Sequence, residues 1–528
     1  MVASPNWSAN RGAVTWVSGT TGQTLNSNGF ITPQNSLVGT AGNAGLGFVG
    51  ENTTSQTFLA AFVIEGSGRL TSSFVDPNQL SYNRGQSQTV TITPGFLTNT
   101  LNTGTDVTLQ ASNDITIEDP IIVRAGGKGG ALTLQAGRSI ILNASISTDN
   151  GSLTLIANDT LANGVVDSQR DPGNAFITMA GRTQLNTGTG RLNIELRNGA
   201  GRTYTGSRSI NLQTITAGSV KVVNNGPSTG SDVILGPVTS NGPQTYSSPN
   251  GTTFVSGNVT AADSPITFAD SVVVDDRLRI DAGSNKIRFN SAGTQNLQTG
   301  SGDSFGNVDH NGTGTLQLAG PLNISGTFTN SAGTFDANDQ PVTVSGLATL
   351  SAGTYRAGTA PQTLLGGLVI GAGTFTSSTG PMSVNGTVAI TGGSLAGEGT
   401  VGPLTVVAGT LIPGAGGPGI LTVGGSVALF FGSTFTVRLN GFEPGTSYSQ
   451  LVAEGPIFLG GSTLNLVLGF EPPVGRSFEI VQGTAPDPIS GTFAGLDEGA
   501  VFEQGGFQFQ ITYIGGNTAN SVVLTRLA

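Results

Sequence analysis

Short segments in which apolar residues alternate with threonine recur along the chain. In the first half they are Val107–Ala111, Leu132–Ala136, Leu153–Ala157 and Ile177–Ala180, and they begin 25, 21 and 24 residues apart. This period-2 alternation is typical of β-strands with one buried face. A repeat of that length with two or three short strands predicts one turn of a parallel β-solenoid. A single turn cannot bury its apolar side chains, and the next turn closes the core and pairs its backbone.

A second set of repeats has a fixed period. The glycine at the centre of each copy falls at Gly333, Gly353, Gly373 and Gly393, a spacing of 20 residues held three times, and Gly409 follows after a shorter step. Glycine permits the positive φ that tight corners require, so we interpret these positions as corners of the coil. Leucine-rich repeats share the period, but their ladder of leucines is absent.

The patterns divide the chain into four segments. Residues 1–100 are irregular and are expected to cap the solenoid, with Phe58–Ile64 as the one place for a short helix. The looser repeats occupy 101–225 and the 20-residue repeats 226–425. Residues 426–528 lose the period and hold eleven of the 25 Phe, which predicts a β-rich C-terminal cap with an aromatic core. A solenoid needs such a cap, because its last turn would otherwise recruit strands from another chain.

Composition agrees with an all-β repeat protein and excludes several functions. The 528 residues include 82 Gly and 24 Pro, together one in five, and only 10% are charged. The net charge is −10 and no run of Lys or Arg occurs, which argues against nucleic-acid binding and anionic membranes. The absence of Cys excludes disulfides and zinc–thiolate sites. We expect no metal and no cofactor.

The sequence shows no apolar stretch long enough to cross a membrane and no signal peptide. The longest apolar run, Phe58–Ile64, is far shorter than the roughly 20 residues that a spanning helix needs. Residues 1–20 lack a basic segment followed by an apolar one. We therefore expect the chain to be a fragment, or to have lost its export segment.

Two parts of the chain resemble known families. Residues 99–225, with "DVTLQASNDITI" and "LTLQAGRSIILNASISTDNGSLTLIAND", resemble filamentous-haemagglutinin-like adhesins exported by the two-partner route. The C-terminal stretches "GPIFLGGSTLNLVLGF" and "GTFAGLDEGAVF" resemble the closing segment of autotransporter-type surface β-solenoid proteins. The resemblance implies a right-handed parallel β-helix, an extracellular or cell-surface location, and a bacterial origin.

Candidate chemistry is confined to acidic residues. His310 is the only histidine, so Ser-His-Asp and Cys-His catalysis have no support, and the Asn-Gly that follows it predicts an exposed turn. Acids one turn apart in a solenoid stack about 5 Å apart, near the carboxylate separation in retaining glycosidases. The densest acidic stretch contains Asp275, Asp276, Asp281 and Asp303, and the last two are 22 residues apart, about one turn. These are the only catalytic candidates, and the competing interpretation is that they are solvated corner residues.

Rows of exposed Thr, Ser, Asn and Gln are the other candidate surface, because they offer an extended hydrogen-bonding strip. We therefore interpret the chain as a non-enzymatic bacterial surface adhesin or stalk that gives reach and attachment or self-association. Its partners would be glycans or proteins of a host, a neighbouring cell or a matrix. One alternative is a polysaccharide lyase or glycoside hydrolase on the same scaffold. The other is a purely structural matrix or fibre component.

Overall fold

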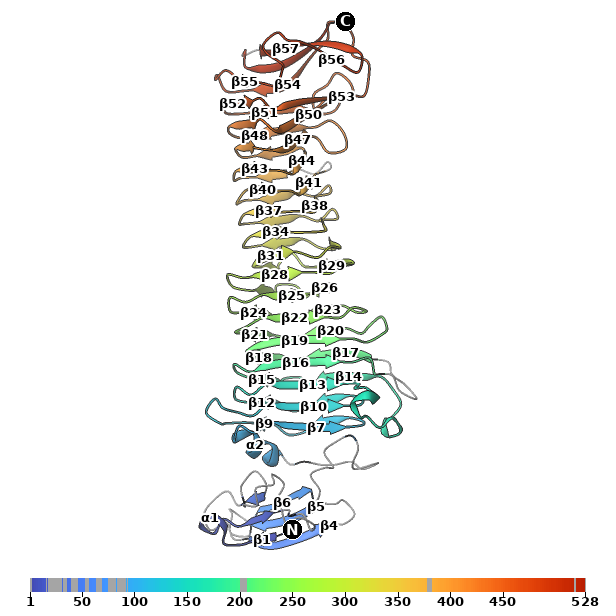
Figure 1. Cartoon of the computed structure of the whole chain (residues 1–528), viewed down its shortest axis with the longest axis vertical. Coiled ribbons are helices and arrows are strands. Elements are labelled where there is room, and N and C mark those ends of the chain that lie inside the picture. The colour runs from blue at the N-terminus through green and yellow to red at the C-terminus, as the bar shows by residue number, and fades with distance from the viewer. Residues whose placement is uncertain are drawn as a thin grey trace. The chain divides into compact units, whose positions relative to one another are not determined.

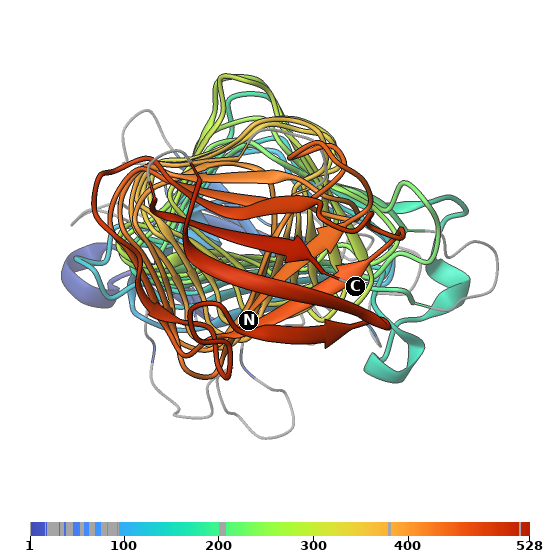
Figure 2. The ribbon, with the colours of Figure 1, turned by 90° about the horizontal axis from the view of Figure 1, so that it is seen from above.

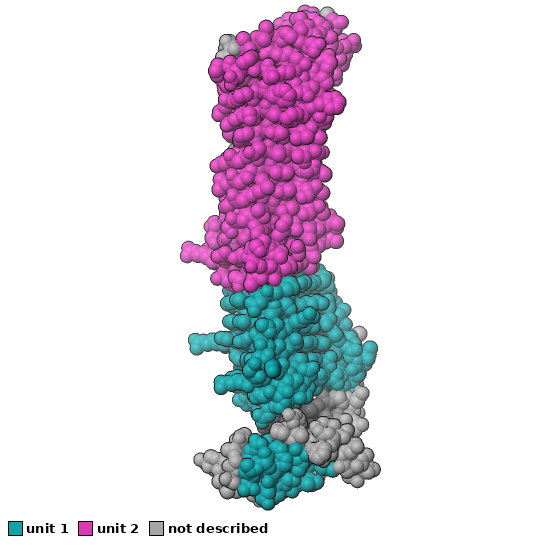
Figure 3. Space-filling model, turned by 60° about the vertical axis from the view of Figure 1, so that its left-hand side comes forward, with its two compact units in different colours: residues 1–257 teal, residues 258–528 magenta. Residues whose placement is uncertain are grey.

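The computed structural model describes residues 2–15, 17, 31, 36–38, 46–52, 57–62, 69–74, 82, 92, 94–199, 207–377, 382–516 and 519–527. The chain divides into two compact units, unit 1 at Met1–Gly257 and unit 2 at Asn258–Ala528, coloured separately in Figure 3. Figure 1 labels their elements. Each unit is dominated by short parallel strands, which confirms the predicted parallel β-helix. Among the described residues, no helix has the length and apolarity that a membrane-spanning segment needs.

The N-terminal part of unit 1 contains two small antiparallel sheets. The first comprises β1 (Val2–Ser4), β2 (Ala13–Thr15) and β3 (Ser36–Val38), with α1 (Trp7–Asn10) between its first two strands. The second comprises β4 (Leu46–Asn52), β5 (Thr57–Phe62) and β6 (Arg69–Phe74).

The helix expected at Phe58–Ile64 is therefore wrong, because its described residues belong to β5, which pairs on both sides. Val63 and Ile64 lie outside the described residues. Periodicity alone cannot distinguish a short apolar strand from a short buried helix. A helix does form later, as α2 (Pro94–Asn102), and its buried Leu97 and Leu101 lie on one face.

Three parallel ladders build the β-helix of unit 1, with one strand of each ladder in every turn. The first comprises β7 (Val107–Ala111), β10 (Leu132–Ala136), β13 (Leu153–Ala157), β16 (Arg191–Leu196), β19 (Ser219–Asn224) and β22 (Gln244–Ser247). The second comprises β8 (Ile115–Ile117), β11 (Ile140–Leu142), β14 (Ala175–Met179), β17 (Ser207–Leu212), β20 (Val233–Leu235) and β23 (Thr253–Val255). The third comprises β9 (Ile121–Ile122), β12 (Ile146–Ser147), β15 (Gln184–Asn186), β18 (Thr214–Ala217) and β21 (Val238–Ser240).

The apolar–Thr–apolar pattern determines which side chains point inward. In β10, Leu132 and Leu134 are fully buried while Thr133 between them is partly exposed. Thr133 pairs with Thr108 in one direction and Thr154 in the other, so like residues stack from turn to turn. The core of unit 1 is thus a column of Leu, Ile and Val inside the coil.

Unit 2 continues the same pattern in three ladders. The first comprises β25 (Ile266–Phe268), β28 (Lys286–Phe289), β31 (Asn307–His310), β34 (Phe328–Asn330), β37 (Ala348–Leu350), β40 (Leu368–Ile370), β43 (Val388–Ile390), β46 (Leu404–Val406), β49 (Val427–Phe430), β52 (Ile457–Gly460) and β55 (Ser490–Thr492). The second comprises β26 (Val272–Val274), β29 (Thr294–Gln298), β32 (Thr315–Leu318), β35 (Thr334–Asp336), β38 (Thr354–Arg356), β41 (Thr374–Thr376), β44 (Ser394–Gly397), β47 (Gly409–Pro413), β50 (Ser433–Leu439) and β53 (Thr463–Leu468). The third comprises β24 (Val259–Ala261), β27 (Arg279–Asp281), β30 (Ser304–Phe305), β33 (Leu322–Ile324), β36 (Val342–Val344), β39 (Gln362–Leu364), β42 (Met382–Val384), β45 (Gly399–Val401), β48 (Ile420–Val423), β51 (Gln450–Ala453) and β54 (Ser477–Gly483). Seen along the stack in Figure 2, the yellow and orange turns of unit 2 lie over one another.

In unit 2, residues 20 apart in the sequence pair with each other in neighbouring turns. Phe335 pairs with Tyr355, which pairs with Phe375, and the three buried rings form a column with both neighbouring centroid separations at 4.7 Å, the first pair tilted and the second stacked. The repeated glycines serve this stacking in two ways. Gly353 adopts a φ of +70°, as a corner requires, whereas Gly393 is needed for space: a Cβ there would lie 2.0 Å from the carbonyl oxygen of Gly373.

The C-terminal end of unit 2 changes from parallel to antiparallel pairing. The parallel ladders extend past residue 425, where the sequence placed the end of the repeats, and reach β53, β54 and β55 through turns of about 30 residues. Beyond them, β58 (Ser521–Arg526) pairs antiparallel with β54, and β57 (Phe507–Gly515) pairs with both β58 and β56 (Val501–Gln504). The antiparallel strands cover the edge that β54 would otherwise leave open.

Candidate functional site

The two acids expected to stack one turn apart lie at opposite ends of a strand pair. Arg279 pairs with Ser304, so Asp303 precedes β30 beside Leu278, whereas Asp281 ends β27. Leu278, the residue beside Asp303, precedes Asp281 by three residues, a separation of about 10 Å along the strand. The expectation that these carboxylates approach to the separation of a retaining glycosidase is therefore wrong. The spacing of 22 residues places Asp281 and Asp303 in neighbouring turns but at different positions of the register.

Asp303 has a structural role in the corner. It is buried, and its two carboxylate oxygens accept backbone N–H groups of Leu278, at 2.9 Å, and Gly300, at 2.7 Å. Asp281 is partly exposed and accepts a hydrogen bond from Arg279 two residues earlier, at 2.5 Å. Asp303 thus links its own turn to the preceding one, and Asp281 is engaged by the arginine on its own strand.

Asp275 and Asp276 lie at the exposed bend after β26. Asp276 forms an ion pair with Arg277, at 3.5 Å between Nε and Oδ2, and the arginine side chain is 86% exposed. An exposed pair of this kind contributes little to stability. Asp275 and Asp276 share this bend, and Oδ1 of Asp276 accepts the backbone N–H of Gly302, at 3.3 Å, in the same turn that Asp303 binds through Gly300. Asp281 lies apart from them, at the end of β27.

His310 is not the exposed turn residue that its sequence context suggested. It is 1% exposed at the end of β31, and its Nδ1 atom is 2.7 Å from Oδ1 of Asn330, the residue paired with it in the next turn. Burial lowers the pKa of His310 below its ordinary value, while the hydrogen bond to Asn330 and the charge of Asp309 oppose this effect. The Asn-Gly turn begins one residue later, so His310 still occupies the last inward position of the strand.

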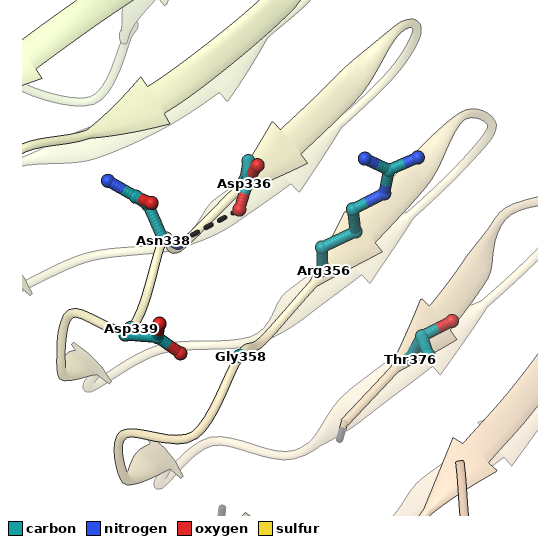
Figure 4. Close-up of a pocket in the computed structure, with 6 residues that line it drawn as sticks. All are labelled: Asp336, Asn338, Asp339, Arg356, Gly358 and Thr376. Atoms are coloured by element: carbon teal, nitrogen blue, oxygen red, sulfur yellow. Dashed lines mark hydrogen bonds between the residues drawn. The ribbon is translucent and has the colours of Figure 1, made fainter. Parts of the chain in front are cut away.

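An open depression of about 340 Å³ lies on the second ladder of unit 2. Figure 4 shows Asp336, Arg356 and Thr376 on three successive strands, β35, β38 and β41, with Asn338, Asp339 and Gly358 on the bends that follow. Asp339 accepts hydrogen bonds from the backbone N–H, at 2.7 Å, and the hydroxyl, at 2.8 Å, of Thr359.

These hydrogen bonds, the backbone one foremost, hold the pKa of Asp339 below its usual range. Asp263 makes the same contact with Ser284 at another corner, and its pKa is lowered in the same way. A carboxylate of this kind stays ionised near neutral pH, which is the wrong state for a general acid. The depression is therefore a polar surface feature with a corner carboxylate that fixes the next turn.

The most elaborate charged cluster surrounds Asp159 in unit 1, and no sequence motif indicated it. The Asp159 carboxylate is fully buried and accepts hydrogen bonds from the hydroxyl of Tyr82, at 2.8 Å, the guanidinium of Arg197, at 2.5 Å, the amide of Asn163 and the N–H of Thr160. Burial alone would raise the pKa of Asp159, but the hydrogen bonds prevail and lower it. Burial, together with the bond to Asp159, raises the pKa of Tyr82 far above its usual value.

This cluster anchors a lateral insertion between β13 and β14, which Figure 1 shows at the side of unit 1. The insertion carries two short 3₁₀ turns, Leu161–Asn163 and Asp167–Gln169. Arg170, which is 5% exposed, donates to the carbonyl oxygen of Asp159 at 2.9 Å. At these positions the ionised Asp159 and the neutral Tyr82 fix the loop, and the geometry assigns them no reactive role.

The third notable surface is aromatic and lies near the end of the first ladder of unit 2. Phe430 and Phe458 on β49 and β52 are 40% and 39% exposed, and their rings meet edge to face with centroids 5.5 Å apart. Phe431 is 82% exposed, and Val407 in the preceding turn is 49% exposed. We call Val407, Phe430, Phe431 and Phe458 the aromatic patch.

The aromatic patch was not predicted from the sequence, where the C-terminal Phe residues were assigned to the core. A signal was present in the alternation: Leu429 and Leu459 point inward, so Phe430 and Phe458 must point outward. Groups of His, Asp or Glu able to hold a metal ion do not occur in the part of the chain that the structure describes.

Comparisons with known proteins assign no function to the chain. A family model described as a repeat of unknown function, DUF5650, matches residues 1–48. None of the curated proteins matches the chain. Among solved structures, the crystal structure of the Haemophilus influenzae Hap adhesin matches with a TM-score of 0.30 and 12% identity, covering 90% of this chain and 70% of that chain. A likeness that weak carries no argument about function, and none of the three shows the filamentous-haemagglutinin family.

Proposed function

We propose that the chain is a non-enzymatic, extracellular surface adhesin or stalk of β-helical architecture, and that it attaches to glycans or proteins of another surface. The sequence resemblance to exported bacterial adhesins and autotransporter-type proteins supports this assignment. Its partners are recognised by the outward faces of the coil and not by a cleft.

One observation carries the proposal. A row of hydroxyl side chains runs along the second ladder of unit 2, one in each of nine consecutive turns and none fully buried, formed by Thr294, Thr315, Thr334, Thr354, Thr374, Ser394, Thr410, Thr434 and Thr463. Neighbouring strands of a sheet are about 4.8 Å apart, so the row presents donors and acceptors at a regular spacing. Such a strip suits an extended partner and offers no enclosed space for catalysis.

The acids favour this assignment over the enzyme alternative, since Asp303 and Asp276 accept backbone N–H groups of neighbouring turns and Asp281 is engaged by Arg279. A glycoside hydrolase needs two carboxyl groups that flank one glycosidic bond. The structural-matrix alternative differs from the adhesin only in its partner, which would be another copy of the chain.

Adhesion of the intact chain tests the proposal. Fluorescent beads coated with the protein are expected to bind cell layers or matrix-coated surfaces above albumin-coated beads. The variant Thr354→Val/Thr374→Val removes two hydroxyls from the row at nearly constant volume, and we expect it to bind more weakly. Beads that bind no surface would overturn the proposal.

A parallel assay for new reducing ends on a polysaccharide panel tests the enzyme alternative. Cleavage that disappears when Asp275, Asp276, Asp281 and Asp303 are changed to Asn would establish an enzyme instead. Fibres of the pure protein without attachment to any surface would favour the matrix component.

A further inference from the structure

We propose that the aromatic patch is a binding site for a neutral polysaccharide chain, in which the apolar faces of hexose rings stack on Phe431 and on the Phe430–Phe458 pair. The inference rests on the proposed function, because it names the ligand class and the residues by which the adhesin attaches.

The rings of the aromatic patch pack beside glycines of the next turn. Phe430 pairs with Gly460 in the next turn, and a Cβ on Gly460 would lie 2.5 Å from Cε1 of Phe458. A Cβ on Gly461 would lie 3.9 Å from Cδ2 of Phe431. The rings therefore lie over backbone that carries no side chain, which leaves their outer surfaces to solvent.

The surroundings of the patch are uncharged and include a few hydroxyl side chains. Phe458 pairs with Ser490 and Gly460 with Thr492 in the following turn, while Thr405 pairs with Ala428 in the turns before. Residues 404–407, 427–433, 457–463 and 490–493 contain no Asp, Glu, Lys or Arg. Hydroxyls beside aromatic rings match a sugar, which presents C–H groups on its face and hydroxyls around its rim. The lack of charge disfavours an anionic polysaccharide or a charged peptide.

The size of the patch argues against a second protein as its occupant. An aromatic side chain has about 200 Å² of surface, so the exposed fractions of the three Phe residues amount to about 300 Å². A stable protein interface needs about 800 Å² from each partner. The largest apolar patch on a monomer commonly has about this size and is often functional.

The test is binding of defined oligosaccharides to the whole chain, measured by calorimetry. The probes are cellohexaose, maltohexaose and chitohexaose, with a galacturonic acid hexamer as the anionic counterpart. We expect at least one neutral probe to bind and Phe431→Ala to raise its Kd at least tenfold. Gly460→Ala, which pushes on the Phe458 ring from below, should weaken binding without removing any aromatic group.

The control is Leu347→Ser/Leu365→Ser, which removes two other exposed apolar side chains, 39% and 43% exposed, from unit 2. We expect this variant to bind like the parent. An equal loss in the control and in Phe431→Ala would overturn the inference, as would binding confined to the anionic probe.

Failure of this inference is distinguishable from failure of the proposed function. Beads that attach to surfaces while the protein binds none of the neutral probes overturn the glycan site and leave the adhesin standing. If Phe431→Ala abolishes self-association seen by sedimentation, the occupant is a second copy and the inference is wrong. Far-ultraviolet circular dichroism of each variant confirms that the β-fold is retained.

Discussion

Tyr355 and Gln362 form a polar pair inside the apolar column of unit 2. The Tyr355 hydroxyl donates to Oε1 of Gln362 at 2.6 Å, and both side chains are buried. Nε2 of Gln362 donates to three backbone carbonyl oxygens, those of Gln340, Ala357 and Ala360. One turn earlier the same two positions are Phe335 and Val342, which lack this bond.

Tyr355→Phe removes the hydroxyl and leaves Oε1 of Gln362 buried without its donor. An unsatisfied buried group of this kind costs about 1 to 3 kcal/mol. Gln362→Val leaves the hydroxyl without its acceptor and removes the amide that donates to these carbonyl oxygens, so we expect a larger loss. The double variant recreates the Phe–Val pair of the preceding turn. Its loss should be smaller than the sum of the single losses by at least about 1 kcal/mol.

Hydrogen exchange measured by mass spectrometry is the suitable assay, because an array of turns opens locally and global unfolding is not two-state. Peptides within residues 346–370 should exchange faster in each single variant, and peptides of unit 1 should not change. Unchanged exchange in Tyr355→Phe, or strictly additive losses in the double variant, would refute the reasoning.

Three further substitutions probe other features. Burial lowers the pKa of His310 below 6.5, so just below that pH the unfolded chain binds more protons than the folded chain. Stability should therefore fall on acidification below about pH 6.5, and the melting temperature of His310→Asn should depend less on pH. Asp159→Ala breaks a buried ion pair and should cost about 3 kcal/mol locally, seen as faster proteolysis of the insertion after β13; unchanged cleavage would contradict its anchoring role. Gly393→Ala, whose Cβ meets the carbonyl oxygen of Gly373, should destabilise its turn by about 1 to 3 kcal/mol in hydrogen exchange, whereas Gly417→Ala, with open space around it, should be neutral.

The fold followed from local patterns, because each turn of a β-helix meets only its neighbours. Alternating strands such as Leu132–Ala136 and the glycines 20 residues apart encode both the strands and their register. Tyr355 is buried at the position of the repeat that Phe335 and Phe375 occupy in the neighbouring turns.

The candidate site was harder to predict because it depends on register and on distant contacts. A one-turn count could not show that Asp281 and Asp303 lie at opposite ends of a strand pair. The bond between Tyr82 and Asp159 joins residues 77 apart with no motif at either end. Its residue type suggests that Phe431 is buried, but Phe431 follows the last residue of β49 and is exposed there.

The equal register of the turns between Leu322 and Ile390 has an evolutionary consequence. Phe328, Ala348, Leu368 and Val388 occupy equivalent places in successive turns, each 20 residues apart. Loss or duplication of 60 nucleotides in this part of the gene would remove or add one whole turn, and the strands brought together would already match. Length can therefore vary between descendants by recombination among the repeats, while the register between successive turns is preserved.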